Sequence, residues 1–394
     1  MFIYKTKEYN FIGGSLNVSD IMTRNFISVG PEESITKLIS LFEKYNLRQV
    51  LVCDNKKLKG IIYTKELAKK GFHNPEKMKV SSIMSFPPPH LSSDSQINEA
   101  AKLILKTGLR ALPVIDNGKV VGIVSMSDII KAASGMKEFR QTTAETIMSI
   151  PEIITDDDDI GRVRYLMREK NISRLPVIDK NKKLLGIVTI FDLLKAVKPV
   201  DRINFYSMAA EKETFMKIPV STIVNDSPVI ADRKATLNEI VNLMDKYRSD
   251  GVIIVENQFP VGMITEKDLL EIYVSSLEQK GVYYQIVGLV DEDEFIVSTV
   301  DRMIRDTLQK VAKIYKPQSF FLHVKRYDKT GKIKYSIRTR LLTDKGIFVS
   351  KSYAWDLRTA SDDALKRLQH IIFKQKGLNE DKIKGMLRFK KLSE

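Results

Sequence analysis

The chain has 394 residues, of which 43% are hydrophobic and 29% are charged. That composition predicts a soluble, globular protein of two or three domains, because one domain takes about 150 residues. A single cysteine, Cys53, excludes an internal disulfide framework. No apolar stretch comes near the ~18 residues that a membrane span needs, and the first residues lack a signal-peptide core, so we expect a cytoplasmic protein.

The positive charge is concentrated near one end of the chain. The formal net charge is +15. Residues 282–394 hold 24 Lys and Arg against 14 Asp and Glu, a net of +10, whereas the 281 residues before them carry only +5. This division predicts a near-neutral body followed by a separate basic module. A charge excess bears on partners rather than on fold, and here it favours a polyanionic partner.

Two landmarks recur four times in the first 275 residues. One is a glycine that opens a strand-to-helix pattern, and its copies are 62, 64 and 76 residues apart: Gly60, Gly122, Gly186 and Gly262. The other keeps the same spacing and reads Ile21-Met22, Ile83-Met84, Ile147-Met148 and Ile223-Val224. Landmarks that recur in step predict an internal repeat of four copies.

Each copy has the pattern of a small β-α-β-β-α unit. In the second copy, a short extended start precedes an amphipathic helix at Ile97–Lys106, a strand at Leu112–Asp116 and the turn Asn117-Gly118. A second strand and a final helix complete the unit. The corresponding helix of the first copy is expected at Ser34–Tyr45.

These landmarks, together with the Leu-Pro-Val-Ile-Asp strand and the Gly-x-x-Thr/Ser-x-x-Asp ending, resemble the CBS domain. The resemblance implies a mixed α/β (α+β) fold in which two copies pair into one Bateman module and the clefts between them bind adenosine nucleotides. We place the copies at 17–75, 76–135, 140–198 and 218–277, after an N-terminal segment at 1–16 and with a linker at 199–217.

The Thr/Ser-x-x-Asp ending has two readings that can coexist. It occurs as Ser125/Asp128, Thr189/Asp192 and Thr265/Asp268, whereas the first copy has Tyr63 and Glu66 instead. A hydroxyl residue followed three positions later by an acid is a capping box, which satisfies backbone N–H groups at a helix start. The family resemblance implies instead that the carboxylate binds ribose hydroxyls, while the helix N-terminus favours phosphate.

A nucleotide phosphate also calls for a cation near the same strands. Arg48, Arg110 and Arg174 stand just ahead of the first long strand in copies one to three, and copy four has Asp250-Gly251 at that place. We take Arg110 and Arg174 as candidate ligand contacts, although an Arg beside a strand is usually only solvated. We expect fewer than four occupied sites, no required cofactor, and AMP, ADP or ATP as a regulatory ligand.

From residue 282 onward the pattern changes to β-α-β-β-β-α, over 282–377, with a basic tail at 378–394. The expected strands are 282–290, 320–327, 332–341 and 346–355, and the expected helices run from the acidic group at 291–294 to about Tyr315 and from Asp356 to Lys374. The third strand alternates apolar Ile333, Tyr335 and Ile337 with cationic residues, so one of its faces should be buried. The simplest arrangement is a sheet with both helices on one face.

This element order, the basic surface and the run from Ala354 to Leu368 resemble the ribosome hibernation promoting factor family. The resemblance implies that the module lies on ribosomal RNA of the small subunit. A solvated surface on a lysine-rich protein is the alternative. The candidate RNA contacts are Lys334, Arg338, Arg340, Arg358, Lys366, Arg367 and Lys374.

Together these patterns predict a non-enzymatic regulator in which the repeats sense an adenine nucleotide and the basic module binds the ribosome, as in ribosome hibernation or translational silencing. No phosphate-binding loop, paired-histidine metal motif or activated nucleophile argues for an enzyme. The family resemblance also implies a homodimer formed through the repeats. The alternative is a regulator whose basic module binds DNA or a protein partner such as an enzyme or a transporter.

Overall fold

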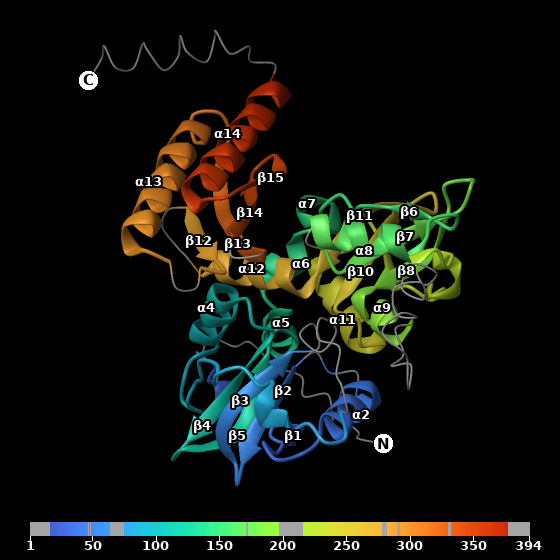
Figure 1. Cartoon of the computed structure of the whole chain (residues 1–394). Helices are drawn as coiled ribbons and strands as arrows, with labels where there is room; N and C mark the ends of the chain where they lie inside the picture. Colours follow the sequence, from blue (N-terminus) through green and yellow to red (C-terminus); the bar gives the residue numbers. More distant parts are fainter. Residues whose placement is uncertain are drawn as a thin grey trace. The chain divides into compact units, whose positions relative to one another are not determined.

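The computed structural model describes residues 16–45, 47, 49–63, 75–170, 172–196, 216–277, 282–289, 292–329 and 332–376. The chain forms two compact units. Figure 1 labels the helices and strands. The first unit consists of residues 1–100 and 111–269, and the second of 101–110 and 270–394. The predicted N-terminal segment, most of the predicted linker and the basic tail lie outside the described residues.

The four copies have the predicted β-α-β-β-α order, apart from the last helix of copy one, which lies outside the described residues. Copy one contains β1 (Ser28–Val29), α2 (Ile35–Tyr45), β2 (Gln49–Asp54) and β3 (Lys57–Tyr63). Copy two contains α4 (Ile97–Thr107), β4 (Ala111–Asp116), β5 (Lys119–Ser125) and α5 (Met126–Ala133), and Leu91 makes a bridge in place of the first strand. Apolar residues on one face of each long helix bury themselves against the strands.

Copies three and four repeat this order. Copy three contains β6 (Ile154–Thr155), α8 (Ile160–Glu169), β7 (Arg174–Ile178), β8 (Leu184–Thr189) and α9 (Ile190–Ala196). Copy four contains β9 (Ile230–Asp232), α11 (Leu237–Tyr247), β10 (Gly251–Glu256), β11 (Phe259–Thr265) and α12 (Glu266–Ser276). The Ile-Met landmarks form single helical turns, and α6 (Lys137–Gln141) joins copies two and three. The turns are α1 (Val18–Ile21), η1 (Val80–Ser82), α7 (Ala144–Ile147) and η2 (Val220–Thr222).

The two recurring landmarks contact each other across paired copies. A Cβ built on Gly122 of copy two would lie 2.7 Å from Sδ of Met22 in copy one, and one built on Gly60 would lie 3.1 Å from Sδ of Met84 in copy two. The same relationship joins Gly262 to Met148 and Gly186 to Val224, in copies three and four. Each landmark turn therefore packs on the partner copy, where only glycine leaves it room, and this explains why the two landmarks recur in step.

Apolar side chains also fill the junction within each pair. Leu51, Ile61 and Val120 join copies one and two, and Ile187, Ile253 and Met263 join copies three and four. The pairing of one with two and of three with four is the arrangement that the sequence predicts for two Bateman modules.

Polar contacts join copy two to copy four within the first unit. The Ser127 hydroxyl donates to the Glu266 carboxylate, and Lys131 Nζ lies 2.8 Å from Asp245 Oδ2. The Asn238 side-chain amide donates to the Ser134 carbonyl at 2.8 Å. Helix α5 and the residue that follows it thus contact copy four.

In the second unit, the C-terminal elements follow the predicted β-α-β-β-β-α order. They are β12 (Tyr283–Val287), α13 (Glu294–Val311), β13 (Pro317–Lys329), β14 (Lys332–Thr343), β15 (Gly346–Ala354) and α14 (Leu357–Gln375). The sheet order is β12-β13-β14-β15, with β12 parallel to β13 and the other neighbours antiparallel. The acidic N-caps Asp293 and Asp356 accept backbone N–H bonds and begin the two helices.

Both C-terminal helices pack on one face of this sheet. Val300, Ile304 and Leu308 of α13 and Ala360, Ala364 and Leu368 of α14 share a core with Phe320, Ile337 and Phe348 of the strands. Side chains alternate along a strand, so Lys334, Arg338 and Arg340 lie on the opposite face, which we call the second face.

Candidate functional site

The three predicted hydroxyl–carboxylate pairs each form the cap of a helix at the end of a strand. In copy two, the Ser125 hydroxyl donates to Asp128 Oδ2 at 2.6 Å, and the backbone N–H of Ser125 donates to the same oxygen at 2.8 Å. In copies three and four, the hydroxyls of Thr189 and Thr265 donate to Asp192 Oδ2 at 2.6 Å and to Asp268 Oδ2 at 2.7 Å. The capping interpretation is therefore confirmed for all three pairs.

The cap bonds of each copy converge on one oxygen of the aspartate. The cap bonds in all three copies end on Oδ2 of the aspartate, so they do not use Oδ1. The strand register places Ala111 opposite Ser125, Arg174 opposite Thr189 and Gly251 opposite Thr265, and so each cap stands beside the start of the copy's first long strand. The cap and ligand roles are geometrically compatible.

Burial makes Asp128 an unusual carboxylate. Desolvation raises the pKa of Asp128 to about 6, although hydrogen bonds from Ser125 oppose the shift. The nearby Glu266 carboxylate raises the Asp128 pKa further, whereas Lys131 lowers it. A hydrogen-bond donor brought to this carboxylate would relieve part of the desolvation cost.

Arg174 does not occupy the position expected of a phosphate contact. It is 8% exposed and forms an ion pair with Asp250, the residue just ahead of β10 in copy four. The Arg174 guanidinium, which the sequence predicts to contact a ligand phosphate, therefore pairs with Asp250 instead. Arg110 is half-buried just ahead of β4, Tyr63 ends β3, and Arg48 and Glu66 lie outside the described residues.

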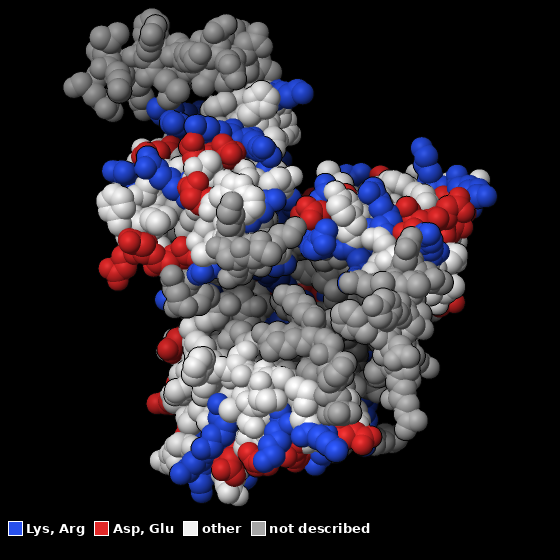
Figure 2. Space-filling view, viewed as in Figure 1, with Lys and Arg blue, Asp and Glu red and all other residues white. Residues whose placement is uncertain are grey.

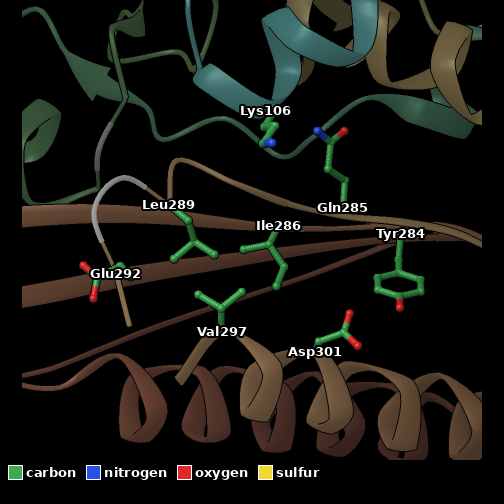
Figure 3. A pocket seen from close by; sticks show the side chains of 8 residues that line it. All are labelled: Lys106, Tyr284, Gln285, Ile286, Leu289, Glu292, Val297 and Asp301. Atoms are coloured by element: carbon green, nitrogen blue, oxygen red, sulfur yellow. The ribbon is translucent and has the colours of Figure 1, made fainter. Parts of the chain in front are cut away.

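The second unit contains a cavity of ≈ 470 Å³ away from every predicted site residue (Figure 3). In Figure 3 the Tyr284 hydroxyl points toward Asp301 on α13, and Asp301 Oδ2 accepts a hydrogen bond from Arg305 at 2.8 Å. The pKa of Tyr284 is raised, first by burial and then by Asp301. The cavity is lined by Lys106, Tyr284, Gln285, Ile286, Leu289, Glu292, Val297 and Asp301.

Helix α14 presents four of the predicted RNA contacts on its exposed side, and we call them the α14 cluster: Arg358, Lys366, Arg367 and Lys374. Lys and Arg side chains are numerous over this part of the C-terminal domain in Figure 2. Lys366 lies 2.5 Å from Asp362 one turn earlier, and Arg367 donates to the Lys351 carbonyl at 2.9 Å. Exposed ion pairs of this kind are weak, so these cations are available to a polyanion.

The strand candidates do not share that surface. Arg340 is 5% exposed, and its NH1 lies 3.3 Å from Glu271 Oε2 of α12, while His323 Nε2 lies 3.2 Å from Glu271 Oε1. Burial lowers the pKa of Arg340 to about 10 and also lowers that of Arg338. Arg340 is a buried structural residue, so its assignment as an RNA contact is corrected here. Lys334 is half-buried on the second face, across the sheet from the α14 cluster.

Sequence reasoning missed two exposed aromatic residues, one on the second face in β15 and one directly after that strand. Tyr353 is 58% exposed and Trp355 is 61% exposed. The alternation of β15 could have identified Tyr353, because it falls between Ser352 and Ala354 on the face away from the helices.

Neither a metal centre nor a membrane span appears in the part of the chain that the structure describes. No group of three or more His, Cys, Asp or Glu in that part could hold a metal ion. No helix there is long and apolar enough to cross a membrane.

Comparison with known families gives four matches along the chain. The family model of the CBS domain matches residues 18–72, 80–135, 144–199 and 220–275. These ranges coincide with the four copies seen in the structure and stop before the C-terminal domain.

Two curated proteins and one solved structure show how far this similarity extends. An uncharacterized protein of Methanocaldococcus jannaschii, MJ1404, is 28% identical over 342 residues, which cover 85% of this chain and 80% of that protein. Residues 1–281 make up less than 85% of the chain, so this alignment must continue into the C-terminal domain. An uncharacterized 33.4 kDa protein in a ribosomal RNA operon of Thermofilum pendens is 28% identical over 200 residues, 48% of this chain and 62% of that protein. The crystal structure of M. jannaschii MJ1225, a putative archaeal homolog of g-AMPK, superposes with a TM-score of 0.53 and 20% identity over 66% of this chain and all of that one.

Proposed function

Because the chain belongs to the CBS-domain family, we propose that it is a regulator that binds adenine nucleotides through its paired repeats and small-subunit ribosomal RNA through its basic C-terminal domain. The observation that carries the first part is the set of three hydroxyl–carboxylate caps, in a family whose paired copies form ligand clefts. The observation that carries the second part is the exposed α14 cluster.

The caps suit the ribose end of a nucleotide. A carboxylate accepts hydrogen bonds from two adjacent hydroxyls, and the first turn of a helix favours a negatively charged group nearby. Copies two, three and four have this arrangement, with Asp128, Asp192 and Asp268 as the acceptors. The Arg174–Asp250 ion pair removes one phosphate contact from the second pair of copies, which supports fewer than four occupied sites.

The α14 cluster suits the backbone of folded RNA. Its four cations lie along one helix, and phosphate contacts dominate the affinity of proteins for nucleic acids. The relative from T. pendens, named for its place in a ribosomal RNA operon, supports a ribosomal partner. Ribosome binding of this kind fits a hibernation or translation-silencing factor.

Helix α12 offers a physical route between the two activities. It starts directly after the Thr265 cap, and Glu271, five residues beyond its first residue, pairs with His323 and Arg340 of the C-terminal sheet. A nucleotide changes RNA binding only if it binds two arrangements of the chain with different affinity. We propose that the α12 start is where that difference arises.

Equilibrium dialysis with AMP, ADP and ATP tests the nucleotide site. Asp128→Asn, Asp192→Asn and Asp268→Asn, made singly, should each weaken a binding event, because the amide oxygen accepts less strongly than a carboxylate. Asp159→Asn is the matched control, since Asp159 caps α8 by accepting from Arg162 at 2.7 Å but belongs to no hydroxyl–carboxylate pair. Equal affinities in all four variants would reject the assignment.

The runner-up is a regulator whose basic domain binds DNA or a protein partner. A pull-down from lysate with and without ribonuclease separates the two, because capture of small subunits through RNA should be lost on digestion. Capture that survives ribonuclease but is lost with deoxyribonuclease, or that survives both, would favour the runner-up.

A further inference from the structure

One end of the second face of the C-terminal sheet carries aromatic and cationic side chains in alternation. The register aligns Lys325, Ser336 and Tyr353 in one row across three strands, and Tyr327 and Lys334 in the next. Neighbouring strands lie ~4.8 Å apart, and same-face residues on one strand lie ~7 Å apart, so these side chains form one continuous surface.

The rings and ammonium groups on this surface are in contact. Lys334 Nζ lies 4.8 Å from the Tyr353 ring centroid, and Lys325 Nζ lies 4.8 Å from that of Tyr327. Tyr353 is more than half exposed, and Trp355, just past the end of β15, is equally exposed. Large aromatic rings left in water at this density are unusual outside binding surfaces.

The charge of this surface is of one sign. Among the strand residues that the structure describes on the second face, every side chain with a fixed charge is Lys or Arg: Lys325, Lys334, Arg338, Arg340 and Lys351. The acid that meets this face, Glu271 of α12, is paired with Arg340 and His323. The end that carries Tyr353 therefore complements a flexible polyanion that also offers flat rings.

Unpaired RNA has that combination. Each nucleotide brings one phosphate and one base with two π-faces, and proteins bind single strands by stacking bases on aromatic rings beside cationic side chains. A duplex keeps its bases stacked inside and offers mainly phosphates, which suits the α14 cluster on the other side of the sheet.

We propose that this surface, formed by Lys325, Tyr327, Lys334, Tyr353 and Trp355, binds unpaired RNA by stacking bases on its rings. The inference rests on the proposed RNA-binding function and adds to it a second contact that is specific for single strands. The lysines hold the phosphates, and Tyr353 and Trp355 receive the bases.

The chain contains its own reporter for this contact, because Trp355 is its one tryptophan. Full-length protein is titrated with a single-stranded RNA of about 12 nucleotides, with the same sequence as a duplex, and with poly-glutamate as a polyanion without bases. The single strand should quench Trp355 emission to saturation, whereas the duplex and poly-glutamate should not. Absence of quenching by the single strand, or equal quenching by the duplex, would overturn the proposal.

Substitutions separate stacking from charge and from misfolding. Tyr353→Ala should weaken single-strand binding about 5- to 100-fold, the loss expected for one stacking ring, whereas Tyr353→Phe should retain it. Tyr247→Ala is the matched control, because Tyr247 is also half-exposed beside a lysine, with Lys246 Nζ 5.0 Å from its ring, but lies on helix α11 of copy four. An unchanged affinity in Tyr353→Ala, or an equal loss in Tyr247→Ala, would contradict stacking on Tyr353.

Failure of this inference is distinguishable from failure of the proposed function. If the protein binds ribosomal subunits but not the single strand, only the stacking surface is wrong. If it binds the single strand with quenching but not ribosomal subunits, the stacking surface stands and the ribosomal assignment is wrong.

Discussion

Arg174 at the start of β7 in copy three and Asp250 just ahead of β10 in copy four form an ion pair between two neighbouring repeats, in which the arginine is buried and the aspartate is half-buried. The sequence predicts Arg174 as a phosphate contact of copy three. In the structure it pairs with Asp250, which belongs to the copy that lacks an arginine ahead of its first long strand.

The first prediction concerns this ion pair. Arg174→Met should lower the free energy of unfolding by about 1–3 kcal/mol, because it removes a buried guanidinium from the half-buried Asp250 carboxylate. The double variant Arg174→Met with Asp250→Leu should recover most of that loss. Urea unfolding measures both, with Lys79→Met as the control. Lys79 pairs with Glu32 on the surface, so the control should change stability by about 0–1 kcal/mol. Additive losses in the double variant would argue against coupling.

A second prediction tests the close approach of paired copies. A Cβ on Gly60 would lie 2.5 Å from the Ser85 carbonyl oxygen, a backbone atom that cannot turn away. Gly60→Ala should therefore cost about 1–3 kcal/mol through overpacking. Gly135→Ala is the control, since the nearest atom to its Cβ is Arg140 NH2 at 3.7 Å. Thermal unfolding compares the two, and equal melting temperatures would contradict the contact.

The third prediction follows from the Asp128 pKa of about 6. The folded chain holds this proton more tightly than the unfolded chain does, so Asp128 contributes stability that is full below pH ~4 and is lost as the pH rises to about 6. The change is at most about 3 kcal/mol. Urea unfolding of wild type and of Asp128→Asn between pH 4 and 7 should show this loss in wild type alone. Parallel pH profiles would refute it.

Nucleotide binding should have the opposite pH dependence at this site. The ionised Asp128 is the better acceptor for ribose hydroxyls, so affinity should increase as the pH rises through about 6. Asp128→Asn should abolish that increase, as equilibrium dialysis at several pH values can show. An increase that persists in Asp128→Asn would assign it to another group.

A fourth prediction separates the two kinds of arginine in the C-terminal domain. Arg340→Met should destabilise this domain by about 3–5 kcal/mol, because it leaves Glu271 buried without this partner. Arg358→Met, on exposed α14, should leave stability within about 0.5 kcal/mol and weaken RNA binding instead. The reverse pattern would restore Arg340 as an RNA contact.

The last prediction concerns salt. Each phosphate that the α14 cluster neutralises should contribute about −0.7 to −0.9 to the slope of log affinity against log salt. Neutralising all four residues should therefore make the slope shallower by about 3. Replacing Lys57, Lys59, Lys119 and Lys180, four exposed lysines of the repeats, should leave it unchanged. Equal effects of the two sets would indicate a diffuse charge effect.

Sequence periodicity predicted most of the element order, for reasons that particular residues make clear. The alternation of Ile333, Tyr335 and Ile337 identified the buried face of β14, because a strand alternates its faces whatever surrounds it. It could not show what meets the other face, since Glu271 reaches Arg340 from a helix almost seventy residues earlier in the chain.

The candidate site was predictable to a similar extent. The hydroxyl–carboxylate caps are local in sequence, with the partners three positions apart, and all three formed. The Arg174–Asp250 pair is a contact between repeats, and repeat spacing shows which positions correspond without showing which side chains meet. Charge alone does not identify Tyr353 and Trp355, because neither side chain is charged.

Sedimentation of the full chain with small ribosomal subunits, with and without AMP, ADP or ATP, tests the central claim most directly. The account predicts that the chain moves with the subunits at low salt and is released as salt rises. It also predicts that at least one nucleotide changes the bound fraction and that this response is reduced by replacing Asp128, Asp192 and Asp268 with Asn. A chain that stays at the top of the gradient under every condition, or a bound fraction that no nucleotide alters, would contradict it.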